Sequence, residues 1–79
     1  MRAQLEERVL EMVSERAEVP VAELTNDTRL EDLGFDSLVL AELSVKLRKE
    51  LGVQASDDEL DFVDSVGELV ELVTRAKAV

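Results

Sequence analysis

The stretch Leu33-Gly34-Phe35-Asp36-Ser37-Leu38 decides how this chain of 79 residues is interpreted. Gly34 is a helix stop signal, and Asp36 and Ser37, just after it, are residues that begin a helix. A side-chain oxygen at such a position accepts from the unpaired N–H groups of the first helical turn. One cap is enough, so if Asp36 supplies it, the Ser37 hydroxyl is free and faces solvent. A phosphate ester on that hydroxyl would sit at the positive end of the helix dipole.

The composition predicts a single all-α domain over residues 1–79. Hydrophobic residues make up 46% of the chain, but Phe35 and Phe62 are the only aromatic ones, so Leu, Val and Ala have to build the core. One Pro and three Gly leave long stretches that can form helices. A chain this short buries only ~60% of the surface that its unfolded state exposes, so we expect modest stability.

Charge and missing residue types exclude several function classes. The net charge of −10 repels nucleic acids and anionic membrane surfaces, and it favours basic patches on partner proteins. The chain has no Cys and no His, so it has no thiol of its own and lacks the usual general base. Ser37 therefore cannot act as an ordinary hydrolase nucleophile. No transmembrane run and no signal core are present, which predicts a cytoplasmic protein.

The spacing of apolar residues predicts a four-helix bundle with three longer helices and one short helix. The predicted ranges are residues 2–16, 37–51, 57–62 and 66–76. Gly52 ends the second helix, and Ser56 and Ser65 cap the third and the fourth, each with a Glu three residues on. The apolar residues expected to face the core are Leu5, Val9, Met12 and Val13 of the first helix, Leu40, Leu43, Leu47 and Leu51 of the second, Leu60, Phe62 and Val63 of the third, and Val66, Leu69, Val70, Val73 and Ala76 of the fourth.

A long connection, residues 17–35, separates the first two helices. Pro20 stops the first helix, and residues 21–24 are expected to form a short helical turn. A loop of this length is unusual in a small domain and indicates function or anchoring. We expect it to be pinned to the core by its apolar residues, which are Val19, Val21, Leu24, Leu30 and Leu33. Gly67, in the fourth helix, is interpreted as a site of close packing against another helix.

The segment Gly34-Phe35-Asp36-Ser37-Leu38, preceded by Leu30-Glu31-Asp32-Leu33, closely resembles the attachment site of acyl carrier proteins. The resemblance extends from about Leu5 to Val73 and includes the length, the acidity and the helix layout. In that family the Ser of an Asp-Ser-Leu motif carries a 4'-phosphopantetheine arm, whose thiol holds an acyl group as a thioester. The resemblance therefore implies that Ser37 carries the arm and that the chain is a carrier and not an enzyme.

The resemblance also implies partners. A phosphopantetheinyl transferase would attach the arm from coenzyme A with the help of a metal ion. Ketosynthases, acyltransferases and related enzymes of polyketide or fatty acid biosynthesis would then contact the second helix of a monomeric carrier. The candidates for this contact lie on the outer side of that helix and are Leu38, Glu42, Val45 and Lys49. Phe35 is expected to pack on the core, and Asp36 is interpreted as a helix cap that could also contact the metal ion.

Charges on the second helix distinguish two branches of the family. They sum to zero, from Asp36, Glu42 and Glu50 against Lys46, Arg48 and Lys49. A balanced helix looks more like the carriers of polyketide assembly lines than the strongly acidic carriers of dissociated fatty acid synthesis.

Other interpretations stay open at this point. A peptidyl or aminoacyl carrier would show the same motif, and an acidic helical interaction domain would use the Leu38–Val45 face without any prosthetic group. Acidic and hydroxyl side chains also match part of an EF-hand calcium loop, at Asp57, Glu59, Asp61, Ser65 and Glu68. Phe62 stands where that loop needs a Gly for its sharp turn, so we expect no metal site.

Overall fold

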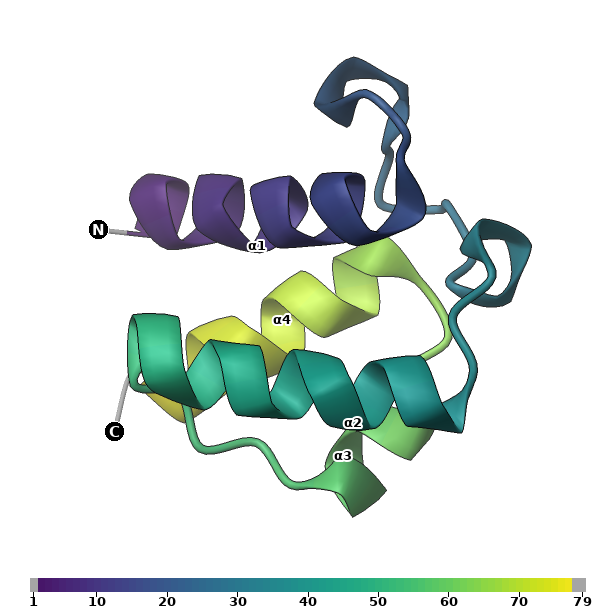
Figure 1. Cartoon of the computed structure of the whole chain (residues 1–79). Coiled ribbons are helices and arrows are strands. Elements are labelled where there is room, and N and C mark those ends of the chain that lie inside the picture. The colour runs from purple at the N-terminus through teal and green to yellow at the C-terminus, as the bar shows by residue number, and fades with distance from the viewer. Residues whose placement is uncertain (1, 78–79) are drawn as a thin grey trace.

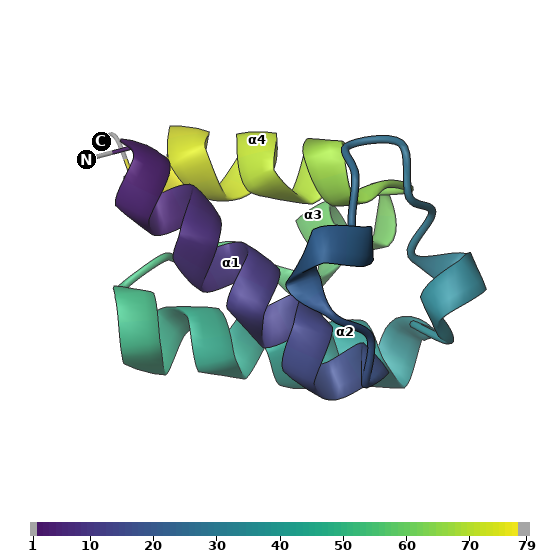
Figure 2. The same cartoon turned by 90° about the horizontal axis from the view of Figure 1, so that it is seen from above.

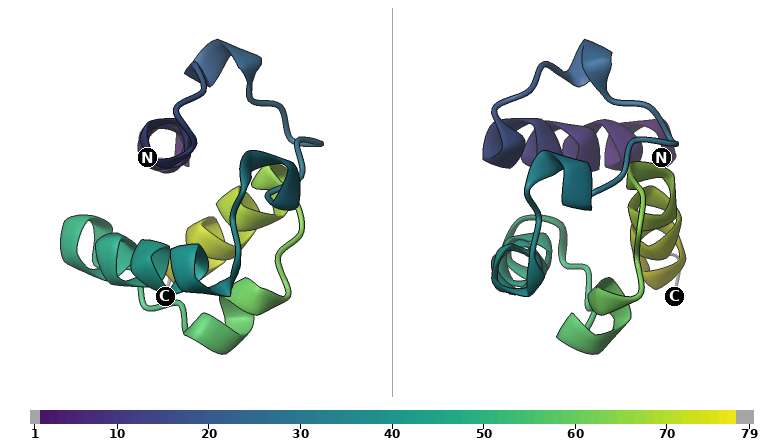
Figure 3. Two further views of the ribbon diagram at one scale, coloured as in Figure 1. Left: turned by 45° about the vertical axis from the view of Figure 1, so that its right-hand side comes forward. Right: turned by 90° about the vertical axis from the view of Figure 1, so that its right-hand side faces the viewer.

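The computed structural model describes residues 2–77, apart from the side chains of residues 2, 3, 57 and 77. Within this range four α-helices surround the core: α1 (Arg2–Ala17), α2 (Ser37–Lys46), α3 (Asp57–Asp61) and α4 (Val66–Lys77). α1 packs against α4, and the short α3 packs against α2 (Figure 1). From above, α1 runs obliquely between α4 and α2 (Figure 2). The end-on view shows the four helices arranged around the core (Figure 3), so the predicted all-α bundle is confirmed.

The predicted helix bounds agree with the observed ones within one residue, except at the end of the second helix. There α2 ends at Lys46 and continues as a π-helical turn, η3 (Leu47–Leu51). Gly52 then stops the helix in the left-handed conformation, with φ of 68°. The N–H of Val53 donates to the carbonyl of Leu47 over 3.2 Å, and Val53 is fully buried. The wide last turn therefore brings Val53 into the core.

The core collects apolar side chains from all four helices and from both connections around α2. Its members are Val9, Met12, Val13, Leu30, Phe35, Val39, Leu40, Leu43, Leu47, Val53, Ala55, Leu60, Val66, Leu69, Leu72 and Val73. One polar side chain is buried with them, Ser44, whose hydroxyl donates to the carbonyl of Ala55 over 2.8 Å. Among the described residues no buried side-chain nitrogen or oxygen lacks a partner, so the core carries no unpaired polar atom.

Apolar residues pin the long loop to the core at fewer points than predicted. Leu30 is buried, and Leu24 and Leu33 pack against the core. Val21 is 41% exposed, so its predicted role is wrong. It lies on a three-residue turn, η1 (Val21–Glu23), which contains no buried residue. A turn of three residues can direct few side chains toward the core. In this part of the loop the side chain that packs against the core is that of Leu24, directly after η1.

Backbone hydrogen bonds fasten the loop to the start of α4. The N–H of Leu30 donates to the carbonyl of Asp64, and the N–H of Val66 donates to the carbonyl of Thr28, both over 2.9 Å. These bonds flank an isolated antiparallel bridge between Arg29 and Ser65. Figure 2 shows the loop passing over the start of α4 before it returns to α2. The loop is therefore held by its main chain as well as by apolar side chains.

Gly67 does allow a close approach, but its neighbour is this loop and not another helix as predicted. The N–H of Gly67 donates to the carbonyl oxygen of Asn26 over 3.0 Å. A Cβ atom on Gly67 would lie 2.9 Å from both the Cβ and the carbonyl oxygen of Asn26. The side chain is absent here because the loop backbone occupies its space.

Gly67→Ala should lower the free energy of unfolding, although Ala in a helix is normally favoured over Gly by up to about 1 kcal/mol. The added methyl overlaps the Asn26 backbone, so we expect a net loss of about 1–3 kcal/mol. Each kcal/mol lowers Tm by roughly 4–8 °C in a domain of this size. Thermal unfolding followed by circular dichroism measures the change. Adding Asn26→Gly removes one of the two clashes and should restore part of the loss, whereas a raised Tm in the single variant would show that the loop yields freely.

Candidate functional site at the start of α2

Asp36 fixes the start of α2. Its backbone is extended, and its Oδ1 accepts a hydrogen bond from the N–H of Val39 over 2.9 Å. Its carbonyl oxygen accepts the first helical bond, from the N–H of Leu40, also over 2.9 Å. The structure therefore has the cap at the residue that the sequence indicates, and Ser37 becomes the first residue of the helix.

The residues before the cap turn the chain outward. A 3-10 turn, η2 (Glu31–Leu33), ends at Gly34, which adopts a left-handed conformation with φ of 84°. This conformation favours Gly because a side chain would be strained there. Phe35 follows with its ring buried and its N–H donating to the carbonyl of Leu30 over 3.0 Å. Phe35 packs on the core as predicted, and this anchor leaves the next two residues facing solvent.

Ser37 is exposed at the N-terminus of α2. Because Asp36 supplies the cap, the Ser37 hydroxyl is not needed to satisfy the first turn. Its hydroxyl has no hydrogen-bond partner among the described residues. The ten residues of α2 aim the positive end of their dipole at this position. The site can therefore accept an anionic group, but the chain holds no His that could activate the hydroxyl.

A groove of about 270 Å³ opens beside Ser37. It lies between the long loop, the first turn of α2 and the segment after α3. Its lining consists of Arg29, Leu30, Glu31, Phe35, Asp36, Ser37, Leu40, Asp61, Val63 and Asp64. The groove thus combines an apolar part with a strongly acidic one.

Arg29 is a residue of this groove that the sequence analysis did not single out. The Nε atom of its guanidinium lies 3.4 Å from Oε1 of Glu31, and both side chains are more than half exposed. The sequence does not indicate this position, because Arg29 is placed beside the groove by its bridge to Ser65, a residue distant in the sequence. No local pattern around Arg29 reports that pairing.

The outer side of α2 is as exposed as predicted. Leu38 is 70% exposed and Val45 is 40% exposed, and Glu42 and Lys49 are exposed as well. Glu42 accepts from Arg16 of α1 over 3.4 Å, which links α1 to the middle of α2. The structure therefore brings the four predicted partner-facing residues onto one accessible side.

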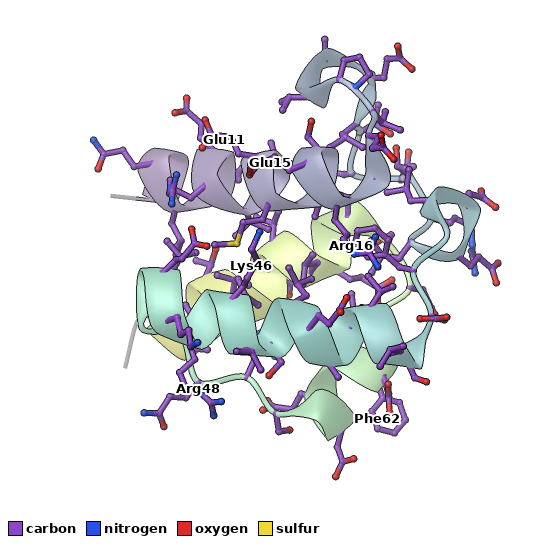
Figure 4. All side chains as sticks on the ribbon, viewed as in Figure 1. Glu11, Glu15, Arg16, Lys46, Arg48 and Phe62 are labelled. Carbon is purple, nitrogen blue, oxygen red and sulfur yellow. The ribbon has the colours of Figure 1, made fainter. Side chains whose placement is uncertain are left out.

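Phe62 does not face the core, so this prediction is wrong. It is 82% exposed, and Figure 4 shows its ring at the edge of the molecule below the first half of α2. α3 has only five residues, and Phe62 is the residue that ends it. So short a helix has one buried side, which Leu60 occupies fully, and Val63 beyond it also packs inward. Apolar periodicity cannot be assigned over a single turn, which is why the sequence misplaced Phe62.

Three residues of the partial calcium-loop pattern, Glu59, Ser65 and Glu68, take part in helix caps. Glu59 forms a capping box with Ser56, whose N–H donates to Oε1 of Glu59 over 3.1 Å. The N–H of Glu68 donates to Oγ of Ser65 over 3.2 Å. The side chain of Asp57 lies outside the described residues. Among the side chains that the structure does describe, no group of three or more His, Cys, Asp or Glu could hold a metal ion.

Comparison with known proteins identifies the family. The model of the phosphopantetheine attachment site family matches residues 7–73, which is most of the chain. This chain belongs to the acyl carrier protein family. It is similar to an acyl carrier protein of Saccharopolyspora erythraea, with 35% identity over 90% of this chain and 76% of that protein. It is also similar to polyketide-8 synthase acyl carrier protein 2 of Streptomyces avermitilis, with 39% identity over 86% of this chain and 79% of that protein.

A solved structure supports the same conclusion. The 3,7-dioxo-octyl actinorhodin acyl carrier protein from Streptomyces coelicolor shares 32% identity, with a TM-score of 0.71 over 99% of this chain and 91% of that one. The recognised family and fold are thus confirmed. Acyl carrier proteins are carrier domains and not enzymes, and their prosthetic group is phosphopantetheine. None of the helices in the described part of this carrier is long and apolar enough to cross a membrane.

Asp36→Ala should destabilise this carrier by about 1 kcal/mol, because the N–H of Val39 loses its acceptor. Asp36→Asn keeps an acceptor oxygen and should stay close to the wild type. Ser37→Ala should change the free energy of unfolding by no more than about 0.5 kcal/mol, since the exposed hydroxyl caps nothing. Urea unfolding curves measure all three. A larger loss for Ser37→Ala than for Asp36→Ala would mean that the cap has been assigned to the wrong residue.

Proposed function

We propose that Ser37 is the residue that carries 4'-phosphopantetheine and that this carrier serves polyketide biosynthesis. The observation that carries the proposal is the division of roles between two neighbours. Asp36 caps α2, which leaves the Ser37 hydroxyl exposed and without a hydrogen-bond partner in the described part of the chain. A phosphate on Ser37 would lie at a helix N-terminus, where the dipole and the unpaired N–H groups stabilise an anion. The residues at this position therefore suit the group.

Attachment forms a phosphodiester between Oγ of Ser37 and the phosphate of the pantetheine half of coenzyme A. The pyrophosphate bond of coenzyme A breaks, adenosine bisphosphate leaves, and the hydroxyl proton passes to a base. Because this chain has no His, the base and the metal ion belong to a separate phosphopantetheinyl transferase. The cap uses Oδ1 of Asp36, so Oδ2 is available to contact that metal ion. Once attached, the arm supplies the thiol that this Cys-free chain lacks, and that thiol holds acyl groups as thioesters.

Two similarities support a polyketide pathway. One relative is a polyketide-8 synthase acyl carrier protein, and the solved structure is the 3,7-dioxo-octyl form of the actinorhodin acyl carrier protein. The charge pattern of α2 and η3 adds an observation from this chain. Glu42 pairs with Arg16 and Glu50 pairs with Arg8, at 3.4 and 3.0 Å, so both carboxylates are partly neutralised by α1.

The cations of the same segment remain unpaired. Within the described residues Lys46, Arg48 and Lys49 form no ion pair, and all three are exposed. Figure 4 shows Arg48 projecting from the bundle at η3. At the start of α2, the groove beside Ser37 is lined by the carboxylates of Glu31, Asp36, Asp61 and Asp64. A partner that contacts the whole length of α2 therefore meets acidic side chains near Ser37 and basic ones about 15 Å further along the helix. Such a partner needs basic side chains opposite Ser37 and acidic side chains opposite the far end of the helix.

The enzymes that exchange acyl groups with the arm, a ketosynthase and an acyltransferase among them, dock on the outer side of α2. Leu38 and Val45 supply exposed apolar area there, with Glu42 and Lys49 beside them. Phe62 adds an exposed aromatic ring directly after α3, the helix that packs on α2. The carrier acts as a monomer, because a net charge of −10 makes its copies repel one another.

Ser37→Ala should abolish attachment of the arm. The protein is incubated with coenzyme A and a phosphopantetheinyl transferase, and its intact mass is measured. The wild type should gain the mass of one phosphopantetheine, and Ser37→Ala should gain none. Ser56→Ala is the matched control, since it removes an exposed hydroxyl from another helix start and should still be modified. Equal labelling of wild type and Ser37→Ala would refute the site.

Leu38→Ala should lower kcat/KM of the transferase about tenfold, which corresponds to about 1.4 kcal/mol of lost contact in the transition state. Leu38 directly follows Ser37 and is 70% exposed, so a transferase at Ser37 has to cover it. Val21→Ala is the control, because Val21 is also exposed but lies on η1. If both variants react at the wild-type rate, Leu38 is not part of the docking surface.

A further inference from the structure

We propose that Arg29 holds the phosphate of the arm beside Ser37, an assignment that rests on Ser37 being the attachment residue. Arg29 and Ser37 line the same groove. Among the described residues that line it, Arg29 is the only cation, against the carboxylates of Glu31, Asp36, Asp61 and Asp64. A phosphodiester on Ser37 adds another negative charge to this acidic groove. The counter-charge available within the groove is the guanidinium of Arg29.

The position of Arg29 is set by the fold. Hydrogen bonds of 2.9 Å on either side of it, from Leu30 to Asp64 and from Val66 to Thr28, fix its main chain. The Arg29–Ser65 bridge between them holds this part of the loop against the start of α4. Because the backbone at Arg29 is already fixed, less conformational entropy is lost when the side chain binds an anion, and binding is stronger as a result.

The guanidinium of Arg29 also has nitrogen atoms that are available to bind an anion. Only its Nε contacts Glu31, at 3.4 Å, which is longer than the ~2.7–2.9 Å of a strong charge-assisted hydrogen bond. Both side chains of this pair are more than half exposed, so the pair is weak and exchanges easily. The two terminal nitrogens have no partner among the described residues. They form the planar fork that binds two oxygens of one phosphate.

Arg29 thereby gives the arm a direction. The N–H groups of the first turn of α2 and the guanidinium of Arg29 would together hold the phosphate. The apolar side chains that line the same groove, Leu30, Leu40 and Val63, would then be available to the start of the arm. Arg29 acts as a positioning residue, since it touches neither the thiol nor its cargo.

The test uses 31P NMR of the arm-bearing protein, after intact mass has shown complete loading. In the wild type the phosphodiester resonance should move with added NaCl, because about 1 M salt screens charges beyond ~3 Å. Arg29→Gln should shift the resonance at low salt by more than its line width and remove most of the salt dependence. Arg29→Lys keeps the charge without the fork and should fall between the two. Glu31→Gln removes the competing carboxylate and should move the resonance in the direction opposite to Arg29→Gln.

Arg48→Gln is the matched control, because it deletes the same charge about 16 Å away along the helix. It should leave the resonance and its salt dependence as in the wild type. If Arg29→Gln and the wild type give the same resonance at low salt, or if Arg48→Gln shifts it equally, the assignment of Arg29 is overturned. Failure of Ser37 to load would show in the mass measurement and would overturn the attachment site itself, so the two failures are distinct.

Discussion

The hydrogen bond from the N–H of Val39 to Oδ1 of Asp36 is the interaction on which the functional site depends. It fixes where α2 begins, and it does so with the residue before Ser37. If Ser37 were the cap, its hydroxyl would be turned toward the helix backbone and would be unavailable for modification. Because Asp36 takes this role, the next hydroxyl is exposed on a rigid element and lies at the positive end of the dipole.

Most of the fold follows from local sequence. Helix positions could be predicted because apolar residues recur with the helical period, and ends could be predicted from Gly52, Ser56 and Pro20, whose effects act within one turn. The mistakes concern segments too short to show a period. Val21 and Phe62 are apolar but exposed, since η1 and α3 each offer the core a single contact that a neighbour makes.

The part of the site that lies within one short stretch of sequence was predictable, and the part that the fold assembles from distant segments was not. Ser37 and Asp36 stand in one contiguous motif, whereas the groove beside them combines the loop, α2 and the segment after α3. The charges of the second helical segment show most clearly what local sequence cannot predict. By sequence the charges of Asp36, α2 and η3 sum to zero, but Arg16 and Arg8 of α1 pair with Glu42 and Glu50. The cations of α2 and η3 are left without an ion pair within the described chain. A sum over one segment cannot include partners that the fold brings from another helix.

The bonds between the long loop and the start of α4 join residues far apart in the sequence, so a large loop has to close before any of them forms. The cap of α2, in contrast, joins Asp36 to Val39 within one turn. If the loop bonds open, Arg29 loses its place beside Ser37, although the cap that exposes Ser37 is untouched. The groove therefore depends on distant contacts that the presentation of Ser37 itself does not need.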